Sequence, residues 1–272
     1  MGLVKNVKIY SVVLIALALV FIFPLSSLGK ETKKEKKAEN EFDIPSHVLS
    51  ISKENTFPNS TEDQEIVEPS KSTKNLMEDA EIEIQNPELI KMLNESTVKP
   101  SPIGFGYRGM VYLGRWPLHY KSLETTVNWE YQPINTNEIN NIGGDEALEM
   151  SYTQENEKEI TGALTNKINN PDDIRKMMLL TAKDKTKLPL SYKTVIGKDT
   201  KKENTYNVPI KKIGELKAYS PAVNEKGQVV FGDVYFKLKG TKKSIQIKNV
   251  TKQGIGAWIP VQDHVSFSFQ VK

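Results

Sequence analysis

The residues best suited to catalysis lie together near the C-terminus. Asp263 and His264 are adjacent, and Ser266 follows two positions later. A histidine that is oriented by a carboxylate can act as the general base for a serine hydroxyl. Side chains two positions apart on a strand share a face, although this spacing alone does not form a triad. His264 and Asp263 are therefore candidates for a hydrolase, and we favour the simpler interpretation that both satisfy loop hydrogen bonds.

Aromatic side chains form the second group of candidates. Tyrosine and tryptophan residues gather in or beside short strand-like segments. Aromatic faces on a sheet can stack on sugar rings or hold a peptide, although most such residues pack in cores. Trp116 and Trp258 are candidates for a carbohydrate- or wall-binding face, because each lies close to a proline, Pro117 or Pro260, that indicates an exposed corner.

Familiar motifs for cofactors and metals are absent or out of context. Residues 104–109 match the G-x-G-x-x-G pattern, but residues 110–113 continue as a strand instead of opening a helix, so we reject a nucleotide site. The chain has no P-loop and no H-E-x-x-H pattern. Its three histidines, His47, His119 and His264, are spread along the sequence, and it has no cysteine. We therefore expect no metal site and no cofactor.

The N-terminus carries an uncharged segment, residues 9–28, preceded by Lys5 and Lys8. This pattern is typical of export. The run from Ile9 to Phe23 has fifteen residues. This length is short for a membrane-spanning helix of about 20 residues but suits a signal peptide. Residues 1–29 are therefore a signal peptide, with cleavage before Lys30 favoured, or an N-terminal membrane anchor. We expect an extracytoplasmic protein that is secreted or held at the membrane.

The charge of the chain is unevenly distributed. Residues 1–99 hold 12 lysines and 16 acidic residues, whereas residues 100–272 hold 25 basic and 18 acidic residues. In an exported protein this pattern is usually two solvated surfaces, and it can also direct the basic half to an anionic wall polymer or a membrane face. Nucleic acid is a poor candidate outside the cytoplasm. The absence of cysteine excludes disulfides and a lipid anchor on a cysteine.

Composition divides the rest of the chain. Residues 30–70 are polar, and we expect a partly disordered tether in which Val48, Leu49 and Ile51 can dock as an extended strand. Residues 71–99 should form two short packing helices, the second capped by Asn86 before Pro87.

Residues 100–272 form a β-rich domain that contains one longer helix. That helix should begin after Asn170 as its cap. A turn is expected at residues 224–227, at 239–241 and at 254–256, and a hairpin, favoured over a helix, around 155–157. The last segment, 264–271, alternates most regularly. The fold class is mainly β (α+β): an antiparallel sandwich or open barrel with one flanking helix.

Four blocks of sequence resemble the YfkD-like family of Bacillus-type bacteria. They are PSHVLSISKENT at 45–56, VNWEYQPINTN at 127–137, RKMMLLTAKDKTKLPL at 175–190 and GIGAWIPVQDHVSFSF at 254–269. The likeness runs from about residue 42 to the C-terminus. It implies an exported or membrane-associated protein and supplies no catalytic residues.

These observations favour a binding or structural module at the cell envelope over an enzyme. The alternatives are an envelope hydrolase that uses His264 and Asp263, and a basic domain that binds an anionic wall polymer. Expected partners are a cell-wall polymer or an envelope protein, and the membrane itself if residues 1–29 are retained.

Overall fold

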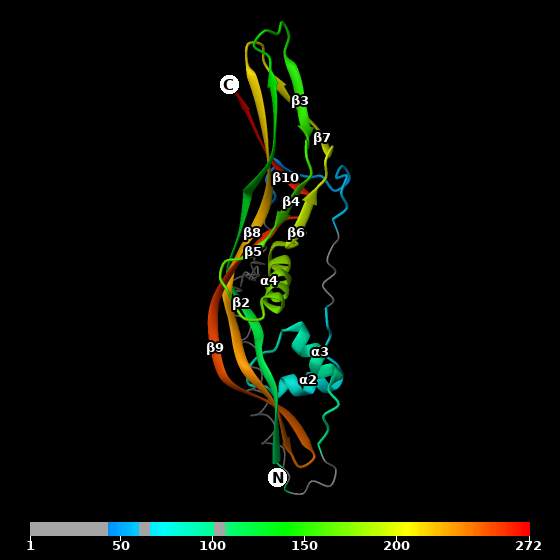
Figure 1. The fold of residues 1–272 in the computed structure, drawn as a ribbon, viewed down its shortest axis with the longest axis vertical. Coiled ribbons are helices and arrows are strands. Elements are labelled where there is room, and N and C mark those ends of the chain that lie inside the picture. The colour runs from blue at the N-terminus through cyan, green and yellow to red at the C-terminus, as the bar shows by residue number, and fades with distance from the viewer. Residues whose placement is uncertain (1–42, 60–65, 101–105, 107) are drawn as a thin grey trace, which may run out of the picture. The chain divides into compact units, whose positions relative to one another are not determined.

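A long antiparallel ladder runs through the part of the chain that the structure describes, residues 43–59, 66–100, 106 and 108–272 of a computed structural model (Figure 1). Its central strand is β8 (Ile213–Lys239). On one side β8 pairs along its whole length with β2 (Arg108–Asn140). On the other side it pairs first with β10 (His264–Val271) and then with β9 (Lys242–Pro260). β1 (Val48–Ser50) and β5 (Ala163–Leu164) complete this sheet.

β2 lies at an edge of the sheet, and its sequence suits that position. The register of β2 against β8 shifts at five points, and Pro117 and Pro133 both lie inside the strand. A proline cannot donate a ladder hydrogen bond, and bulges interrupt the regular edge. Residues 85–86 cover one stretch, since their backbone N–H groups donate to the carbonyl of Leu118. These features limit pairing of this edge with other chains.

Two small sheets lie beside the ladder. β3 (Leu148–Thr153) pairs with β7 (Lys201–Val208), and β4 (Lys158–Thr161) pairs with β6 (Lys193–Ile196). The hairpin expected around residues 155–157 is therefore wrong. The segment is extended as predicted, but each strand pairs with a segment that follows the intervening helix.

The three helices among the described residues are α2 (Lys71–Glu78), α3 (Pro87–Glu95) and α4 (Pro171–Thr186). Asn86 caps α3 as predicted, because its side chain accepts hydrogen bonds from the amides of Glu88 and Leu89. Asn170 precedes α4 but does not cap it. Its backbone is left-handed, with φ of 54°, and its side chain makes no capping hydrogen bond. The acidic first turn and basic last turn of α4 still complement the helix dipole.

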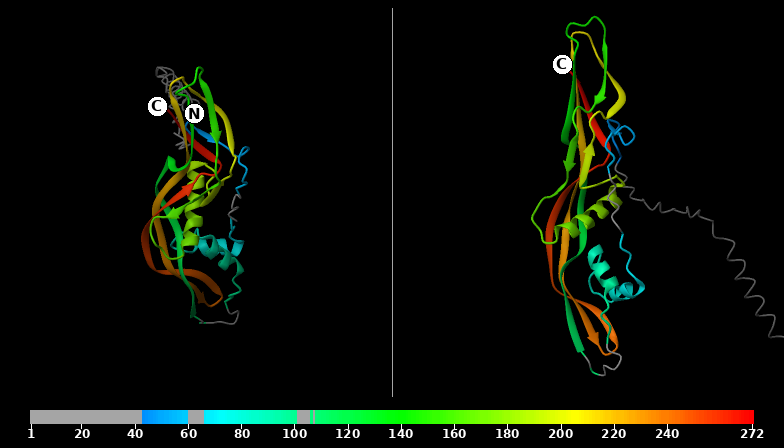
Figure 2. Two further views of the ribbon diagram at one scale, coloured as in Figure 1. Left: turned by 45° about the horizontal axis from the view of Figure 1, so that its top comes forward. Right: turned by 45° about the vertical axis from the view of Figure 1, so that its right-hand side comes forward.

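Three hydrophobic clusters follow one another along β8. Leu216 and Ala218 pack with the small sheets, Val223 and Val229 pack with α4, and Val234 and Phe236 pack with α2 and α3. Figure 2 shows the same order in two further views, with α4 between the small sheets and the α2–α3 pair. The prediction of a mainly antiparallel β fold is confirmed, and the described strands form no closed barrel.

Two predicted turns are wrong because both segments continue as strands. Residues 224–227 lie inside β8, and residues 254–256 lie inside β9. A Cβ atom on Gly227 would lie 2.3 Å from the carbonyl oxygen of Lys121 and 2.5 Å from the hydroxyl of Tyr120. The turn at 239–241 is confirmed, with Gly240 at φ of 57° between β8 and β9.

The N-terminal arm docks as expected at one strand. β1 pairs antiparallel with β10, and Ile51 is fully buried. In β10, Val265 and Phe267 are buried as the alternation predicts, and Ser266 between them is buried as well. No helix among the described residues is long and apolar enough to cross a membrane. The export segment, residues 9–28, lies outside the described residues.

Candidate functional site

Asp263, His264 and Ser266, the hydrolase candidates, are close in sequence. Among the described residues, no hydrogen bond connects their side chains with one another. The carboxylate of Asp263 accepts hydrogen bonds from the side-chain amides of Asn55, at 2.8 Å, and Asn59, at 2.5 Å. Nδ1 of His264 lies 2.7 Å from the carbonyl oxygen of Gln262. The Ser266 hydroxyl is buried and has no hydrogen-bond partner among the described residues. Asp263 therefore holds the N-terminal arm, and the hydrolase alternative stays a prediction.

Neither candidate tryptophan lies at an exposed corner. Trp116 is half-buried inside β2, and its indole nitrogen donates to the carbonyl of Leu113 at 2.9 Å. Trp258 is half-buried inside β9 and stacks on Tyr131 with ring centroids 4.8 Å apart. The corner expectation is wrong because Pro117 and Pro260 are buried strand residues. The structure does not bring the two tryptophans together in one face, and their role in binding a ligand stays a prediction.

A different surface, at the β8–β9 hairpin end of the ladder, gathers cations. Side chains of β8 alternate there between buried Val234, Phe236 and Leu238 and the opposite face. Cross-strand partners share a face, so each exposed rung joins one residue from each of β2, β8 and β9. The four rungs of this basic face are Arg108–Lys239–Lys242, Met110–Lys237–Ser244, Tyr112–Tyr235–Gln246 and Arg115–Asp233–Lys248.

The first rung consists of three cations and is the most informative feature of the basic face. Arg108 lies opposite Lys239, which lies opposite Lys242, and all three are exposed. Like charges directly opposite on neighbouring strands destabilise a sheet. No carboxylate among the described residues forms an ion pair with these three cations or with Lys237 in the next rung. This repulsion is therefore uncompensated within the described residues.

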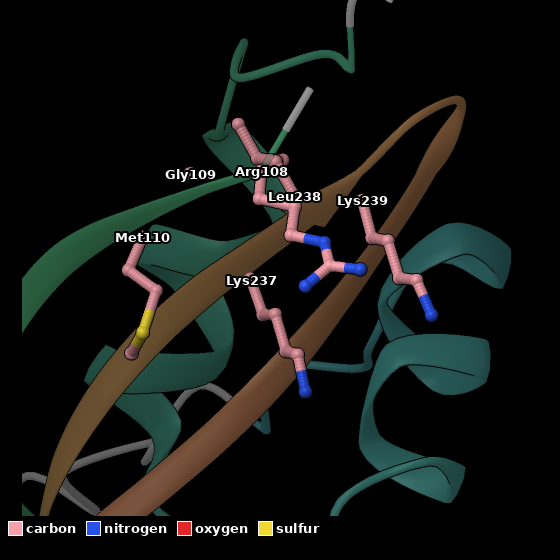
Figure 3. Close-up of a pocket in the computed structure, with 6 residues that line it drawn as sticks. All are labelled: Arg108, Gly109, Met110, Lys237, Leu238 and Lys239. Atoms are coloured by element: carbon pink, nitrogen blue, oxygen red, sulfur yellow. The ribbon is translucent and has the colours of Figure 1, made fainter. Parts of the chain in front are cut away.

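A hollow of about 350 Å³ opens between the first two rungs. Its lining residues are Arg108, Gly109, Met110, Lys237, Leu238 and Lys239. Figure 3 shows the side chains of Arg108, Lys237 and Lys239 running in the same direction from neighbouring strands. These three cations, which pair with no carboxylate of the described segments, can hold an anion in the hollow, and the guanidinium of Arg108 suits a planar or tetrahedral oxyanion.

The third rung is aromatic, and the fourth contains one acidic residue. The rings of Tyr112 and Tyr235 lie with centroids 5.0 Å apart. Arg115 forms an ion pair with Asp233 at 3.1 Å. Hydrogen bonds from Asn249, the larger effect, and from Arg115 lower the pKa of Asp233. Lys248 places its ammonium 5.4 Å from the centre of the Tyr235 ring. Among the described residues, four of the five cations of the basic face without an ion pair therefore lie in its first two rungs, and the fifth is Lys248.

Sequence reasoning missed the basic face because its residues come from three strands far apart in the chain. The alternation from Asp233 to Lys239 was available as a signal, since every second residue there is apolar. The register of β2 was not available, because bulges shift it. Among the described residues, no group of three or more histidine or carboxylate side chains could hold a metal ion.

Comparison with known proteins places the chain in a family. The family model described as YfkD-like protein matches residues 45–272. "Uncharacterized protein YfkD" of Bacillus subtilis (strain 168) is 53% identical over 234 residues, which cover 86% of this chain and 89% of that protein. No solved structure matches the chain. Since the match extends over the ladder, the helices and the basic face, the chain belongs to the YfkD-like family.

Proposed function

We propose that this protein is an exported binding module that holds an anionic polymer of the cell envelope on its basic face. The observation that carries the proposal is the rung of three exposed cations, Arg108, Lys239 and Lys242, which no described carboxylate compensates. An anionic ligand in the adjacent hollow would remove the repulsion between these cations and gain attraction to each of them.

The proposed location outside the cytoplasm rests on the N-terminal sequence. The uncharged segment 9–28 follows Lys5 and Lys8, and the chain has no cysteine. The basic excess of residues 100–272 would attract a wall polymer over several ångströms, with a strength that falls as salt is added. The protein would be secreted, or held at the membrane by residues 1–29.

Co-sedimentation with purified cell walls tests the binding. The full chain, purified in mild detergent, is mixed with walls before and after chemical removal of their phosphate-linked polymers. The test variant carries Arg108→Gln, Lys237→Gln and Lys239→Gln. The control variant carries Lys198→Gln, Lys201→Gln and Lys212→Gln, which remove the same charge from exposed residues away from the basic face.

The wild type and the control variant should sediment with intact walls and remain in solution with stripped walls. Three lost contacts to charged groups should weaken wall binding of the test variant at least about tenfold, which corresponds to about 1.4 kcal/mol. Equal sedimentation of the two variants would show that the general charge of the protein, not the basic face, determines wall binding.

Export has its own test. The N-terminal sequence of the protein recovered from cells and from medium would show whether the chain is cut before Lys30. A chain found only in the cytoplasm with residue 1 or 2 at its N-terminus would contradict the proposed location.

A further inference from the structure

We infer that the ligand of the basic face is a glycan that carries an uncharged sugar ring next to an anionic group, and that this ring stacks on Tyr112. The inference rests on the proposed function and adds the chemical class of the polymer. It comes from the order of the rungs along the strands, in which an aromatic rung follows two cationic ones.

The position of the Tyr112 ring allows a flat ligand group to stack on it. Its side chain is 55% exposed, which is unusual for a large ring in the middle of a strand ladder. The ring rests against Tyr235 at 5.0 Å between centroids, and the two planes are tilted by 41°. Lys248 in turn contacts the Tyr235 ring. Packing on one side therefore holds the Tyr112 ring in place while the other side faces solvent.

The spacing of the rungs places an anion site beside the Tyr112 ring. Residues two positions apart on a strand are separated by about 7 Å, so the cationic Lys237 rung lies about 7 Å from the Tyr112–Tyr235 rung. The ammonium of Lys248 reaches toward the same side, because it lies 3.9 Å from the sulfur of Met110 in the Lys237 rung. This arrangement matches an uncharged ring that has an anionic group next to it.

Two other ligands fit the basic face less well. A polyanion without rings would bind the cations but leave the exposed face of Tyr112 unused. An anionic bilayer would contact the residues that project farthest, whereas Arg108, Lys237 and Lys239 line a hollow. Arg115 adds little net charge for a flat anionic surface, because Asp233 already pairs with it.

The test compares two carboxylate polymers that differ in the ring. Hyaluronan carries an uncharged sugar between successive carboxylates, and poly-L-glutamate carries carboxylates without sugar rings. Binding of each to the full chain in mild detergent is measured for the wild type, Tyr112→Leu, Tyr112→Phe and the Arg108→Gln, Lys237→Gln, Lys239→Gln variant. A thermal melt of each variant confirms folding, and Tyr112→Phe keeps the ring.

Loss of the stacked ring should weaken hyaluronan binding by Tyr112→Leu roughly two- to tenfold, from the usual size of aromatic contacts. The same variant should bind poly-L-glutamate as the wild type does, and Tyr112→Phe should bind both polymers normally. If Tyr112→Leu changes the two affinities equally or changes neither, the ring inference is overturned. If the triple variant also binds both polymers normally, the proposed function fails with it.

Vesicles of phosphatidylglycerol in a neutral lipid provide a third arm. The inference expects hyaluronan to compete with any binding to these vesicles. Vesicle binding that depends on Tyr112 and that hyaluronan does not displace would assign the basic face to a bilayer and overturn the glycan inference.

Discussion

Replacing Tyr120 by phenylalanine should destabilise the fold, because the Tyr120 hydroxyl donates a hydrogen bond to a buried carboxyl group. Glu225 in β8 is fully buried beneath α4. One of its oxygens accepts a hydrogen bond from the Tyr120 hydroxyl at 2.9 Å, and the other accepts from Thr125 at 2.6 Å. Burial, and then the nearby Glu225 carboxyl group, raise the pKa of Tyr120. Tyr120 therefore remains a donor across the accessible pH range.

The size of the loss follows from what the substitution leaves behind. Tyr120→Phe keeps the ring in the core and removes only the donor to Glu225. A buried acceptor without its partner costs about 1–3 kcal/mol. For a folded unit of about 230 residues, each kcal/mol lowers the melting temperature by about 2–4 °C.

Tyr192 provides a matched control in the same hydrophobic cluster. Its ring packs against that cluster, and its hydroxyl is buried without a hydrogen-bond partner among the described residues. Tyr192→Phe removes a polar group that gains nothing, so its free energy of unfolding should equal or exceed that of the wild type. Urea unfolding is followed by tryptophan fluorescence, to which Trp129 in the same cluster contributes. Equal losses for the two variants would refute the hydrogen-bond explanation and indicate a general requirement for tyrosine.

Three further predictions concern glycine packing, the N-terminal arm and acid stability. Gly227→Ala should destabilise the fold, because its Cβ atom would lie 2.3 Å from a backbone oxygen, whereas Gly254→Ala meets no atom within 4 Å and should be tolerated; thermal melts of both variants check this. Asn55→Ala removes the side chain that bonds the arm to β6 and Asp263, so limited proteolysis should cut near residue 55 faster than in the wild type, and an unchanged rate would contradict the anchoring. The hydrogen bond from Lys176 lowers the pKa of Glu88. The stability that this pair contributes is therefore full above about pH 4.3 and is lost as the pH falls further. Unfolding measured between neutral and acid pH should show a smaller decrease in the free energy of unfolding for Glu88→Gln than for the wild type.

Local signals predicted the helices and the strand character of the chain well, because caps and alternation act over a few residues. Asn86 and Pro87 mark the start of α3, and the period of two in residues 264–271 marks β10. Pairing could not be predicted in the same way. β3 and β4 are close in sequence, yet β3 pairs with β7 and β4 pairs with β6. These partners follow α4 in the chain, so the pairing depends on tertiary packing that local sequence does not show.

Glycine misled the sequence interpretation because it also occurs inside strands. Residues 224–227 and 254–256 suggested turns, whereas both segments continue as strands. Gly227 admits the Tyr120 hydroxyl and Gly256 lies against Thr165, while Gly254 meets no atom within 4 Å. The candidate site shows the same limit. Asp263 and His264 stood out because they are adjacent, while the basic face remained hidden because Arg108 and Lys239 meet only through a register that bulges determine.

Lysine footprinting on intact cells tests the central claim most directly. A membrane-impermeant acetylating reagent is applied to cells, and mass spectrometry reads the modification of each lysine before and after the wall polymers are stripped. We expect Lys198, Lys201 and Lys212 to react in both states, and Lys237, Lys239 and Lys242 to react fully only after stripping. If all six react equally on intact cells, the basic face holds no polymer, and if none reacts until the cells are broken, the protein is not exported.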